Sequence, residues 1–122
     1  MEFQKKHAIY LQIADLMCER ILAQDWPENE RIPSVRELAV DLEVNPNTVM
    51  RAYAYLQDQK IIYNKRGIGY FVARDGVHTT RGLLKSNFVR DDLPHMFKTL
   101  DLLDMNFDEL SVLYRVFKEE QT

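Results

Sequence analysis

The sequence has very little cysteine and no long hydrophobic run. Cys18 is the single cysteine among 122 residues, so it cannot form an internal disulfide, and a metal site would need several such ligands. Residues 1–7 lack the apolar stretch of a signal peptide, and no segment approaches the roughly 18 apolar residues that a membrane span requires. These absences predict a cytoplasmic protein in which Cys18 is a small buried residue.

Catalytic and metal-binding patterns are missing as well. His7, His78 and His95 are scattered without metal-ligand spacing, and no Ser/His/Asp or Cys/His set stands out. The acidic residues of the C-terminal part are typical of solvated helix faces and helix starts. We therefore expect a protein that is not an enzyme and holds neither a metal nor a cofactor. With 46% hydrophobic and 29% charged residues, the composition is that of an ordinary globular protein.

Acidic residues outnumber basic ones, but the excess is unevenly distributed. The net charge of −3 by itself argues against a protein that binds polyanions indiscriminately. Residues 1–30 carry a net charge of −3 and residues 77–122 carry −2, whereas residues 31–76 carry +2. The middle third is the only basic segment, so an acidic body would lower non-specific affinity for DNA around it.

Apolar periodicity predicts helices over about residues 9–23, 34–42 and 46–59. The second begins with Ser34-Val-Arg-Glu37, a capping-box pattern in which the serine hydroxyl and the glutamate carboxylate satisfy amides at the helix start. The third begins with Asn45-Pro46, where asparagine suits the N-cap and proline the first helical position. A tight turn joins the second and third helices.

A β-hairpin is predicted after the third helix. Residues 61–63 and 70–73 are β-type runs around a polar loop that contains glycine, and residues 30–32 form a further short extended piece. The fold class is mainly α with a small β-hairpin, and the order of elements is that of a winged helix-turn-helix. Such a unit inserts the second helix of the pair into the DNA major groove and lays the hairpin loop along the backbone or minor groove.

The predicted third helix has two different faces. At 100° per residue, one face is apolar and consists of Val49, Ala52, Tyr53 and Leu56. The opposite face carries short polar side chains, one arginine and no bulk at its centre, so it can approach base edges closely; it consists of Asn47, Met50, Arg51, Ala54 and Asp58. The helix start is expected to offer free amides and a positive dipole end to a phosphate.

Three sequence segments carry a family resemblance. They are Ile32-Pro-Ser-Val-Arg-Glu-Leu-Ala39, Val44-Asn-Pro-Asn-Thr-Val-Met-Arg-Ala-Tyr53 and Gly67-Ile-Gly-Tyr-Phe-Val72. They resemble the GntR family of bacterial transcription regulators, and the Asn-Pro-Asn-Thr-Val run with the short C-terminal part is most similar to its YtrA subfamily. The resemblance implies a homodimer that binds a palindromic operator, usually as a repressor.

Motif and resemblance together give a set of candidate DNA contacts. The candidates lie at the starts of the second and third helices, on the exposed face of the third helix and at the hairpin tip. They are Ser34, Arg36, Asn45, Asn47, Thr48, Met50, Arg51, Lys65, Arg66 and Gly67. The sequence departs from the family where Pro46 replaces a common arginine and where the helix arginine stands at Arg51 instead of at Met50. Glu43 occupies a turn position commonly held by glycine, which predicts local strain.

The last segment is predicted to form two or three short amphipathic helices. Their apolar stripes need a cover, and a symmetric dimer is the commonest one, although packing on the first helix of the same chain is an alternative and both can hold. We therefore divide the chain into a DNA-binding domain at residues 1–76 and a helical dimerisation extension at residues 77–122. The stripes consist of Leu93, Met96, Phe97, Leu100, Leu103, Leu110, Leu113, Tyr114 and Phe117.

The predicted function is that of a homodimeric, sequence-specific DNA-binding regulator whose partners are operator DNA and a second copy of itself. Arg51 is expected to contribute to base recognition and Lys65 to contact the backbone. The alternative is a winged-helix protein-interaction module whose exposed face binds a protein. Residues 77–122 are too few to bury a core and also enclose a ligand cavity of about 300–1,000 Å³, and the sequence names no effector.

Overall fold

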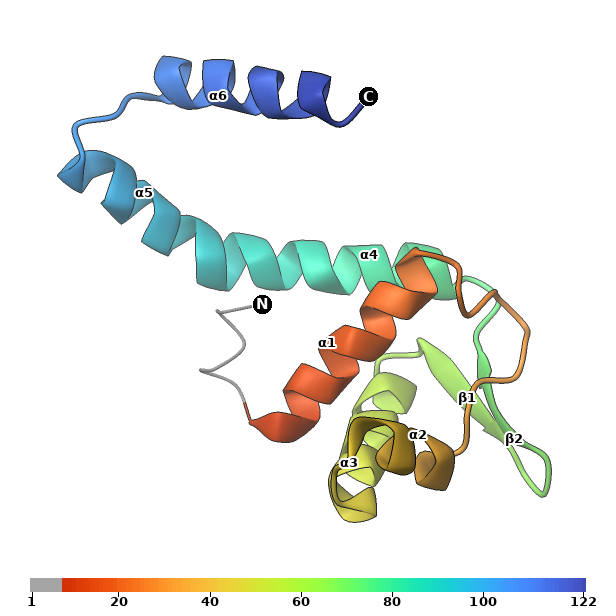
Figure 1. Cartoon of the computed structure of the whole chain (residues 1–122). Coiled ribbons are helices and arrows are strands. Elements are labelled where there is room, and N and C mark those ends of the chain that lie inside the picture. The colour runs from red at the N-terminus through yellow and green to blue at the C-terminus, as the bar shows by residue number, and fades with distance from the viewer. Residues whose placement is uncertain (1–7) are drawn as a thin grey trace. The chain divides into compact units, whose positions relative to one another are not determined.

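The computed structural model describes residues 8–122, which form two compact units (Figure 1). The first unit ends at Leu83 and contains α1 (Ile9–Leu22), α2 (Val35–Leu42), α3 (Pro46–Asp58), β1 (Ile62–Lys65) and β2 (Gly69–Val72). The second covers Leu84–Thr122 and contains a π-helical turn η2 (Phe88–Asp92), α5 (Leu93–Leu102) and α6 (Phe107–Glu120). Helix α4 (Gly76–Asn87) begins in the first unit and ends in the second. The mainly helical fold with one hairpin is confirmed.

Both predicted helix starts are present. The Ser34 hydroxyl accepts a hydrogen bond from the Glu37 amide at 3.1 Å, and the Glu37 carboxylate accepts one from the Ser34 amide at 2.9 Å. At the start of α3, the side-chain oxygen of Asn45 accepts a hydrogen bond from the Asn47 amide at 2.7 Å. The two short helices therefore begin at residues that the sequence specifies locally.

The core of the first unit forms where the apolar stripes of its helices meet. All four residues of the predicted α3 stripe have an exposed fraction of 0%. The phenol of Tyr53 donates a hydrogen bond to the Pro33 carbonyl oxygen at 2.6 Å, so the one polar group of this stripe is satisfied. Besides the α3 stripe, the buried apolar residues are Ile13, Ala14, Met17, Cys18, Ile21, Ile32, Leu38, Ala39, Ile61, Ile62 and Val72.

The strain predicted at the turn between α2 and α3 is confirmed. Glu43 adopts φ 56° and ψ 47°, the left-handed region that favours glycine. We expect Glu43→Gly to raise the free energy of unfolding by about 0.5–1 kcal/mol, because relief of the strain outweighs the extra entropy of glycine in the unfolded chain. Urea denaturation measures the change. Asp41→Gly is the control, since glycine inside α2 should destabilise; a lower stability for Glu43→Gly would contradict the prediction.

The hairpin is longer and its loop shorter than the sequence predicted. β1 pairs antiparallel with β2 from Ile62 opposite Val72 to Lys65 opposite Gly69, so the expected loop residues 64, 65 and 69 belong to the strands. The Ile68 amide donates to the Lys65 carbonyl oxygen at 2.9 Å and closes a four-residue turn. The prediction failed because polar residues carry no β signal of their own, whereas cross-strand pairing extends the ladder to the turn.

A third chain segment joins the hairpin. Arg31 forms a β-bridge with Phe71, and the Ile32 amide donates to the Tyr70 carbonyl oxygen at 2.9 Å. The Val72 amide in turn donates to the Glu30 carbonyl oxygen at 3.1 Å. The extended piece predicted at residues 30–32 is therefore paired with β2, and we call this bridge together with β1 and β2 the wing.

Helix α4 begins at a glycine that packs closely against β2. Gly76 is its first residue, and a Cβ atom there would lie 2.6 Å from Val72 Cγ1, so only glycine fits without displacement. The amide of the next residue, Val77, donates to the Glu28 carboxylate at 3.1 Å. This helix start thus packs on the first unit, which ends at Leu83.

One buried hydroxyl of α4 carries a stability prediction. Thr80 is fully buried, and its Oγ1 has no hydrogen-bond partner in the described part of the chain. We expect Thr80→Val to raise the free energy of unfolding by about 1 kcal/mol, because valine keeps the shape and removes an unsatisfied polar atom. Thermal unfolding compared with Thr79→Val, which lies at a less buried position, measures it. Destabilisation by Thr80→Val would mean that the hydroxyl has a partner.

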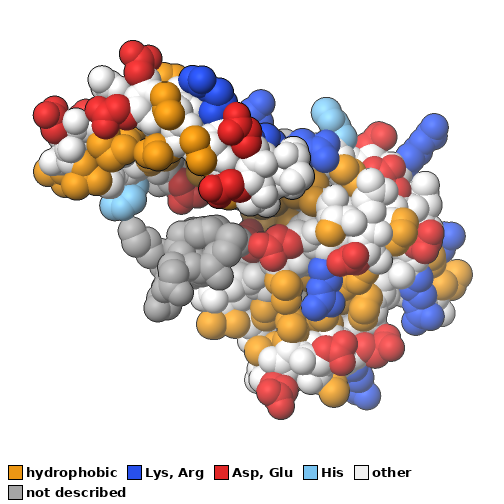
Figure 2. Space-filling view, turned by 45° about the horizontal axis from the view of Figure 1, so that its top comes forward, with side chains coloured by type: hydrophobic (Ala, Val, Ile, Leu, Met, Phe, Trp, Pro, Cys, Tyr) orange, Lys and Arg blue, Asp and Glu red, His pale blue; other side chains and the backbone are white. Residues whose placement is uncertain are grey.

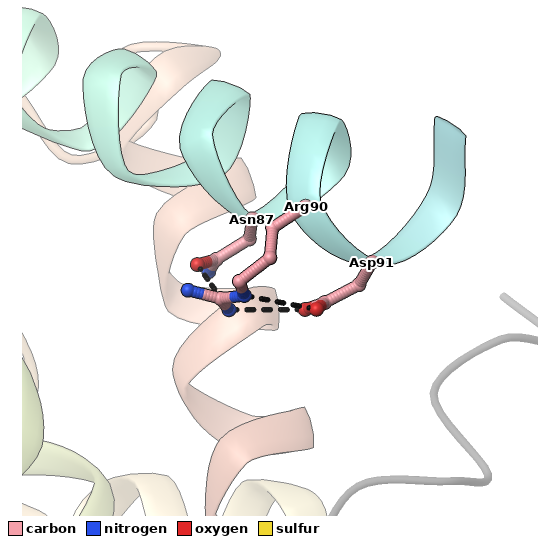
Figure 3. A network of polar contacts seen from close by, with 3 residues as sticks. All are labelled: Asn87, Arg90 and Asp91. Carbon is pink, nitrogen blue, oxygen red and sulfur yellow. Dashed lines mark hydrogen bonds and ion pairs between the residues drawn. The ribbon is translucent and has the colours of Figure 1, made fainter. Parts of the chain in front are cut away.

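The second unit begins inside a continuous helical run. Residues 76–102 are helical throughout, and η2 forms a π-helical turn between α4 and α5. In this turn the Arg90 guanidinium donates to both oxygens of the Asp91 carboxylate, at 2.9 and 3.0 Å, and to the Asn87 side-chain oxygen at 3.0 Å (Figure 3). The Asn106 side chain caps the last helix by accepting a hydrogen bond from the Glu109 amide at 2.9 Å.

Two further observations concern the single cysteine and the search for a membrane-spanning helix. Burial raises the pKa of the Cys18 thiol to about 12, and the nearby charges of Asp15 and Glu19 add to the effect, so the thiol stays protonated at neutral pH. Among the helices of residues 8–122, none is long and apolar enough to cross a membrane.

Candidate nucleic-acid interface

Helix α3 presents one polar face to solvent while its opposite face is completely buried. Asn47, Met50, Arg51, Ala54 and Asp58 are all exposed, as the helical spacing predicted. Since the helix is anchored by four buried side chains, the exposed face is held rigidly on the first unit. Ala54 lies between Met50 and Arg51 in angular position, so the middle of the face has no side chain beyond a methyl group.

The expectation of free amides at the start of α3 is wrong. Pro46 has no amide hydrogen, and the Asn47 amide is taken by the Asn45 side chain. The Thr48 and Val49 amides donate to the Asn45 carbonyl oxygen at 3.0 and 3.2 Å. The capped start of α3 therefore offers a phosphate the positive end of the helix dipole but no unpaired N–H groups. A DNA contact at this point must use side chains.

Arg51 is drawn toward α1. Its Cζ atom lies 4.1 Å from the ring centroid of Tyr10, within the distance of a cation–π contact. Tyr10 in turn contacts Tyr55 edge to face, with a centroid separation of 6.4 Å. The guanidinium thus rests on an aromatic pair contributed by α1 and α3, a contact that no spacing within α3 could predict.

Met50 is drawn the other way, toward the wing. The Tyr70 hydroxyl lies 4.0 Å from the Met50 sulfur, and the Tyr70 ring packs edge to face on Tyr53 at 4.8 Å. Burial raises the pKa of Tyr53 well above its usual range, with Tyr70 and Glu37 adding to it, so its hydroxyl remains a donor to Pro33. These contacts join the exposed face of α3 to the wing.

The start of α2 contributes two of the predicted residues. Ser34 uses its hydroxyl oxygen to accept the Glu37 amide, which leaves the hydroxyl hydrogen as a donor. The hydrogen bonds from Ser34 lower the pKa of the Glu37 carboxyl, chiefly the one from the Ser34 amide. Arg36 is exposed one residue before Glu37, beside Val40 and Asp41 on the outer face of α2.

The tip of the wing holds the three predicted wing residues. Arg66 and Gly67 are the two central residues of the turn that Ile68 closes, and Gly67 has φ 78°, which this turn requires of its third residue. No heavy atom lies within 4 Å of a Cβ built on Gly67, so the tip is open. Lys65 extends back along the wing, with its ammonium 4.9 Å from the Phe71 ring.

Sequence reasoning missed Arg31. Its side chain crosses the wing against Gly69, where a Cβ atom would lie 2.8 Å from the Arg31 Nε. It stands on the same face as Phe71, its bridge partner, whose ring stacks on Tyr63 at 5.5 Å. Arg31 and Lys65 therefore flank a stacked aromatic pair. The signal available in the sequence was weak, because only the β-bridge makes Arg31 part of the wing.

The predicted residues separate into two groups. The DNA-contact candidates lie on α2, α3 and the wing of the first unit, whereas the dimerisation candidates lie on α5, α6 and their connection in the second. Of the latter, Leu103, Leu113, Tyr114 and Phe117 are exposed by more than half. In residues 8–122 no three His, Cys, Asp or Glu side chains form a group that could hold a metal ion.

Comparison with protein families identifies this arrangement. The family described as "Bacterial regulatory proteins, gntR family" matches residues 9–72, which comprise α1, α2, α3, β1 and β2. The chain belongs to the GntR family. GntR proteins are DNA-binding transcription regulators and not enzymes, so the polar face of α3 and the basic wing belong to the DNA-binding domain of a GntR regulator.

Relatives of known sequence or structure extend the match. The HTH-type transcriptional repressor YtrA of Bacillus subtilis is 33% identical over 113 residues, which are 91% of this chain and 82% of YtrA. A crystal structure of a GntR-family regulator from Bacteroides thetaiotaomicron has a TM-score of 0.79 and 46% identity, covering 94% of this chain and 100% of that one. The DNA-binding domain of AraR, solved in complex with operator ORR3, covers 52% of this chain and 77% of its own, at 28% identity and a TM-score of 0.51.

Proposed function

We propose that this GntR regulator is a homodimeric repressor that binds a palindromic operator through α3. The observation that carries the proposal is the rigid polar face of α3, which has an alanine at its centre and cation-bearing segments on either side. Such a face fits the major groove, where its short polar side chains can reach base edges. Because bacterial DNA lies in the cytoplasm, this function requires a cytoplasmic protein.

The proposed DNA contacts lie on three elements of the first unit. α3 supplies the groove contacts, while the start of α2 and the wing supply contacts to the backbone. Arg31 joins the wing contacts because its bridge to Phe71 places it beside the two strands that carry Lys65. The full set is Arg31, Ser34, Arg36, Asn45, Asn47, Thr48, Met50, Arg51, Lys65, Arg66 and Gly67.

The second unit supports a dimer with a second copy of this chain. No residue of Leu84–Thr122, all of which the structure describes, is buried. The apolar positions of α6 span an arc of about 220°, counted at 100° per residue, with Glu109 and Glu120 inside it. Figure 2 shows hydrophobic side chains on the surface of α5 and α6, beside acidic ones. The exposed large residues of α6 are Phe107, Val112, Leu113, Tyr114, Val116 and Phe117.

These features favour a second copy of this chain as the partner that covers the apolar surface of α5 and α6. Two identical apolar surfaces satisfy each other without a further partner, and two-fold symmetry is the commonest arrangement of soluble oligomers. Two first units in one dimer would meet two half-sites, so a palindromic operator follows from the symmetry of the protein. The role of repressor is supported by the relative YtrA, which is named a repressor.

Selection of bound fragments from the host genome tests the proposal. The purified protein should enrich a small set of promoter fragments that share an inverted repeat. Affinity for such a fragment should fall by roughly 10³- to 10⁵-fold between 50 and 200 mM salt, if six to ten phosphates are contacted. Absence of a common inverted repeat, or binding that salt does not affect, would overturn the proposal and favour a protein-interaction module.

A further inference from the structure

Within the proposed DNA interface, we propose that Arg51 contacts an operator phosphate and that Tyr10 is a positioning residue that holds the guanidinium there. The inference rests on the proposed function and assigns the chemistry of one contact within it. It differs from the expectation, based on sequence alone, that Arg51 recognises a base. What changes the assignment is the aromatic surface on α1 against which Arg51 lies.

The direction of the side chain carries the first step. An arginine that recognises guanine extends from the groove-facing side of its helix and donates two parallel hydrogen bonds to a base edge. The Arg51 guanidinium lies over the face of Tyr10, a residue of α1, with 4.1 Å from Cζ to the ring centroid. It is therefore displaced from the middle of the exposed α3 face, marked by Asn47 and Ala54, toward the border between α3 and α1.

The chemistry of the contact carries the second step. A cation–π contact uses the flat face of the guanidinium, whereas its N–H donors lie in the plane and point outward from its edge. Stacking on Tyr10 thus fixes the orientation of the group and leaves its donor edge for an acceptor. A phosphate oxygen suits this edge, because arginine binds phosphate with two parallel hydrogen bonds.

The support behind Tyr10 carries the third step. Tyr10 is half-buried and packs edge to face on Tyr55, so its ring is also contacted by α3. Ordering Arg51 before DNA arrives removes part of the entropy cost of fixing a long side chain on binding. On the opposite side of the α3 face, Met50 contacts the Tyr70 hydroxyl. With Arg51 assigned to a phosphate, Asn47 and Met50 are the side chains expected to contact bases, and the small side chain of Ala54 leaves room for the bases to approach.

Titrations of operator and of random DNA with Arg51→Ala test the phosphate assignment. Both affinities should fall by the same factor, on the order of 10- to 100-fold for a dimer, and the slope of log affinity against log salt should drop by about 2, one phosphate for each protomer. A loss confined to the operator, with an unchanged salt slope, would show that Arg51 recognises a base and would overturn the assignment. Arg51 is exposed, so this variant should fold.

A double-mutant cycle tests the role of Tyr10. Tyr10→Leu should weaken both DNAs by about 5- to 25-fold for a dimer and lower the salt slope, whereas Tyr10→Phe, which keeps the ring, should bind as the original protein does. In the Arg51→Ala background, Tyr10→Leu should cause no further loss. An equal loss in both backgrounds, or a loss for Tyr10→Phe matching that of Tyr10→Leu, would overturn the positioning role.

These outcomes remain distinct from failure of the proposed function. If the original protein selects no inverted repeat and binds DNA without salt dependence, the function itself fails before any variant is compared. If the protein binds as proposed but Arg51→Ala lowers only the affinity for the operator, the proposed function is supported and the phosphate contact of Arg51 is contradicted. The melting temperature of each variant, measured in parallel, separates loss of the fold from loss of the contact.

Discussion

Leu113→Glu combined with Phe117→Glu is expected to make the protein monomeric and to reduce its affinity for the operator by roughly 100- to 10,000-fold. Both side chains are more than half exposed on α6, at the centre of its broad apolar arc. Two glutamates there would have to be buried without a partner if a second copy still covered the helix. The loss on DNA follows because linking two binding units multiplies affinity by about 10² to 10⁴.

The measurement is the molar mass in solution, followed by operator titration of the same sample. The original protein should have twice the chain mass of 14.5 kDa and the variant a single chain mass. Ser111→Glu combined with Lys118→Gln is the matched control, since it makes the same change in net charge on the polar arc of α6. A variant that keeps the dimer mass would exclude α6 from the dimer contact.

Ala54→Glu is expected to reduce operator affinity by at least about 100-fold while leaving the fold intact. Ala54 is exposed in the middle of the α3 face between Asn47 and Met50, and glutamate is a good helix former, so the free helix should tolerate it. In the groove, the longer side chain would displace the helix and bring a negative charge near two phosphate backbones. A cost of about 3 kcal/mol for the dimer corresponds to this factor.

Two further substitutions separate the causes of that loss. Ala54→Gln has nearly the same size without the charge, so it should retain part of the affinity. Ala23→Glu makes the identical change at an exposed alanine just after α1, roughly 20 Å along the helix from Tyr10, and should have little effect. Operator binding by Ala54→Glu at the original affinity would mean that another face of the protein contacts DNA.

Sequence reasoning succeeded where structure is specified by residues close together in the chain. The capping box at Ser34, the cap at Asn45 and the left-handed turn at Glu43 are each decided within about four residues. The stripe that buries Tyr53 was predictable because helical periodicity is also local. Together these features set the exposed face of α3, so most of the candidate interface could be located from the sequence.

Several features that could not be located from the sequence involve contacts between distant segments. Arg31 became a wing residue only through its bridge to Phe71, and the direction of Arg51 is decided by Tyr10 on another helix. The start of α4 at Gly76 depends on space against Val72 and on the Glu28 carboxylate. Local propensity contains no information on any of these contacts, since each is made by folding itself.

The burial of Cys18 makes its thiol a probe of local opening at α1. The side chain lies on the inner face of α1 with 1% of its surface exposed, and its pKa of about 12 keeps the reactive thiolate scarce. A thiol reagent can therefore reach it only after α1 separates from the core. Since no other cysteine competes, the rate of modification of the unaltered protein reports how often that separation occurs, and operator DNA should slow it if α1 is held in the complex.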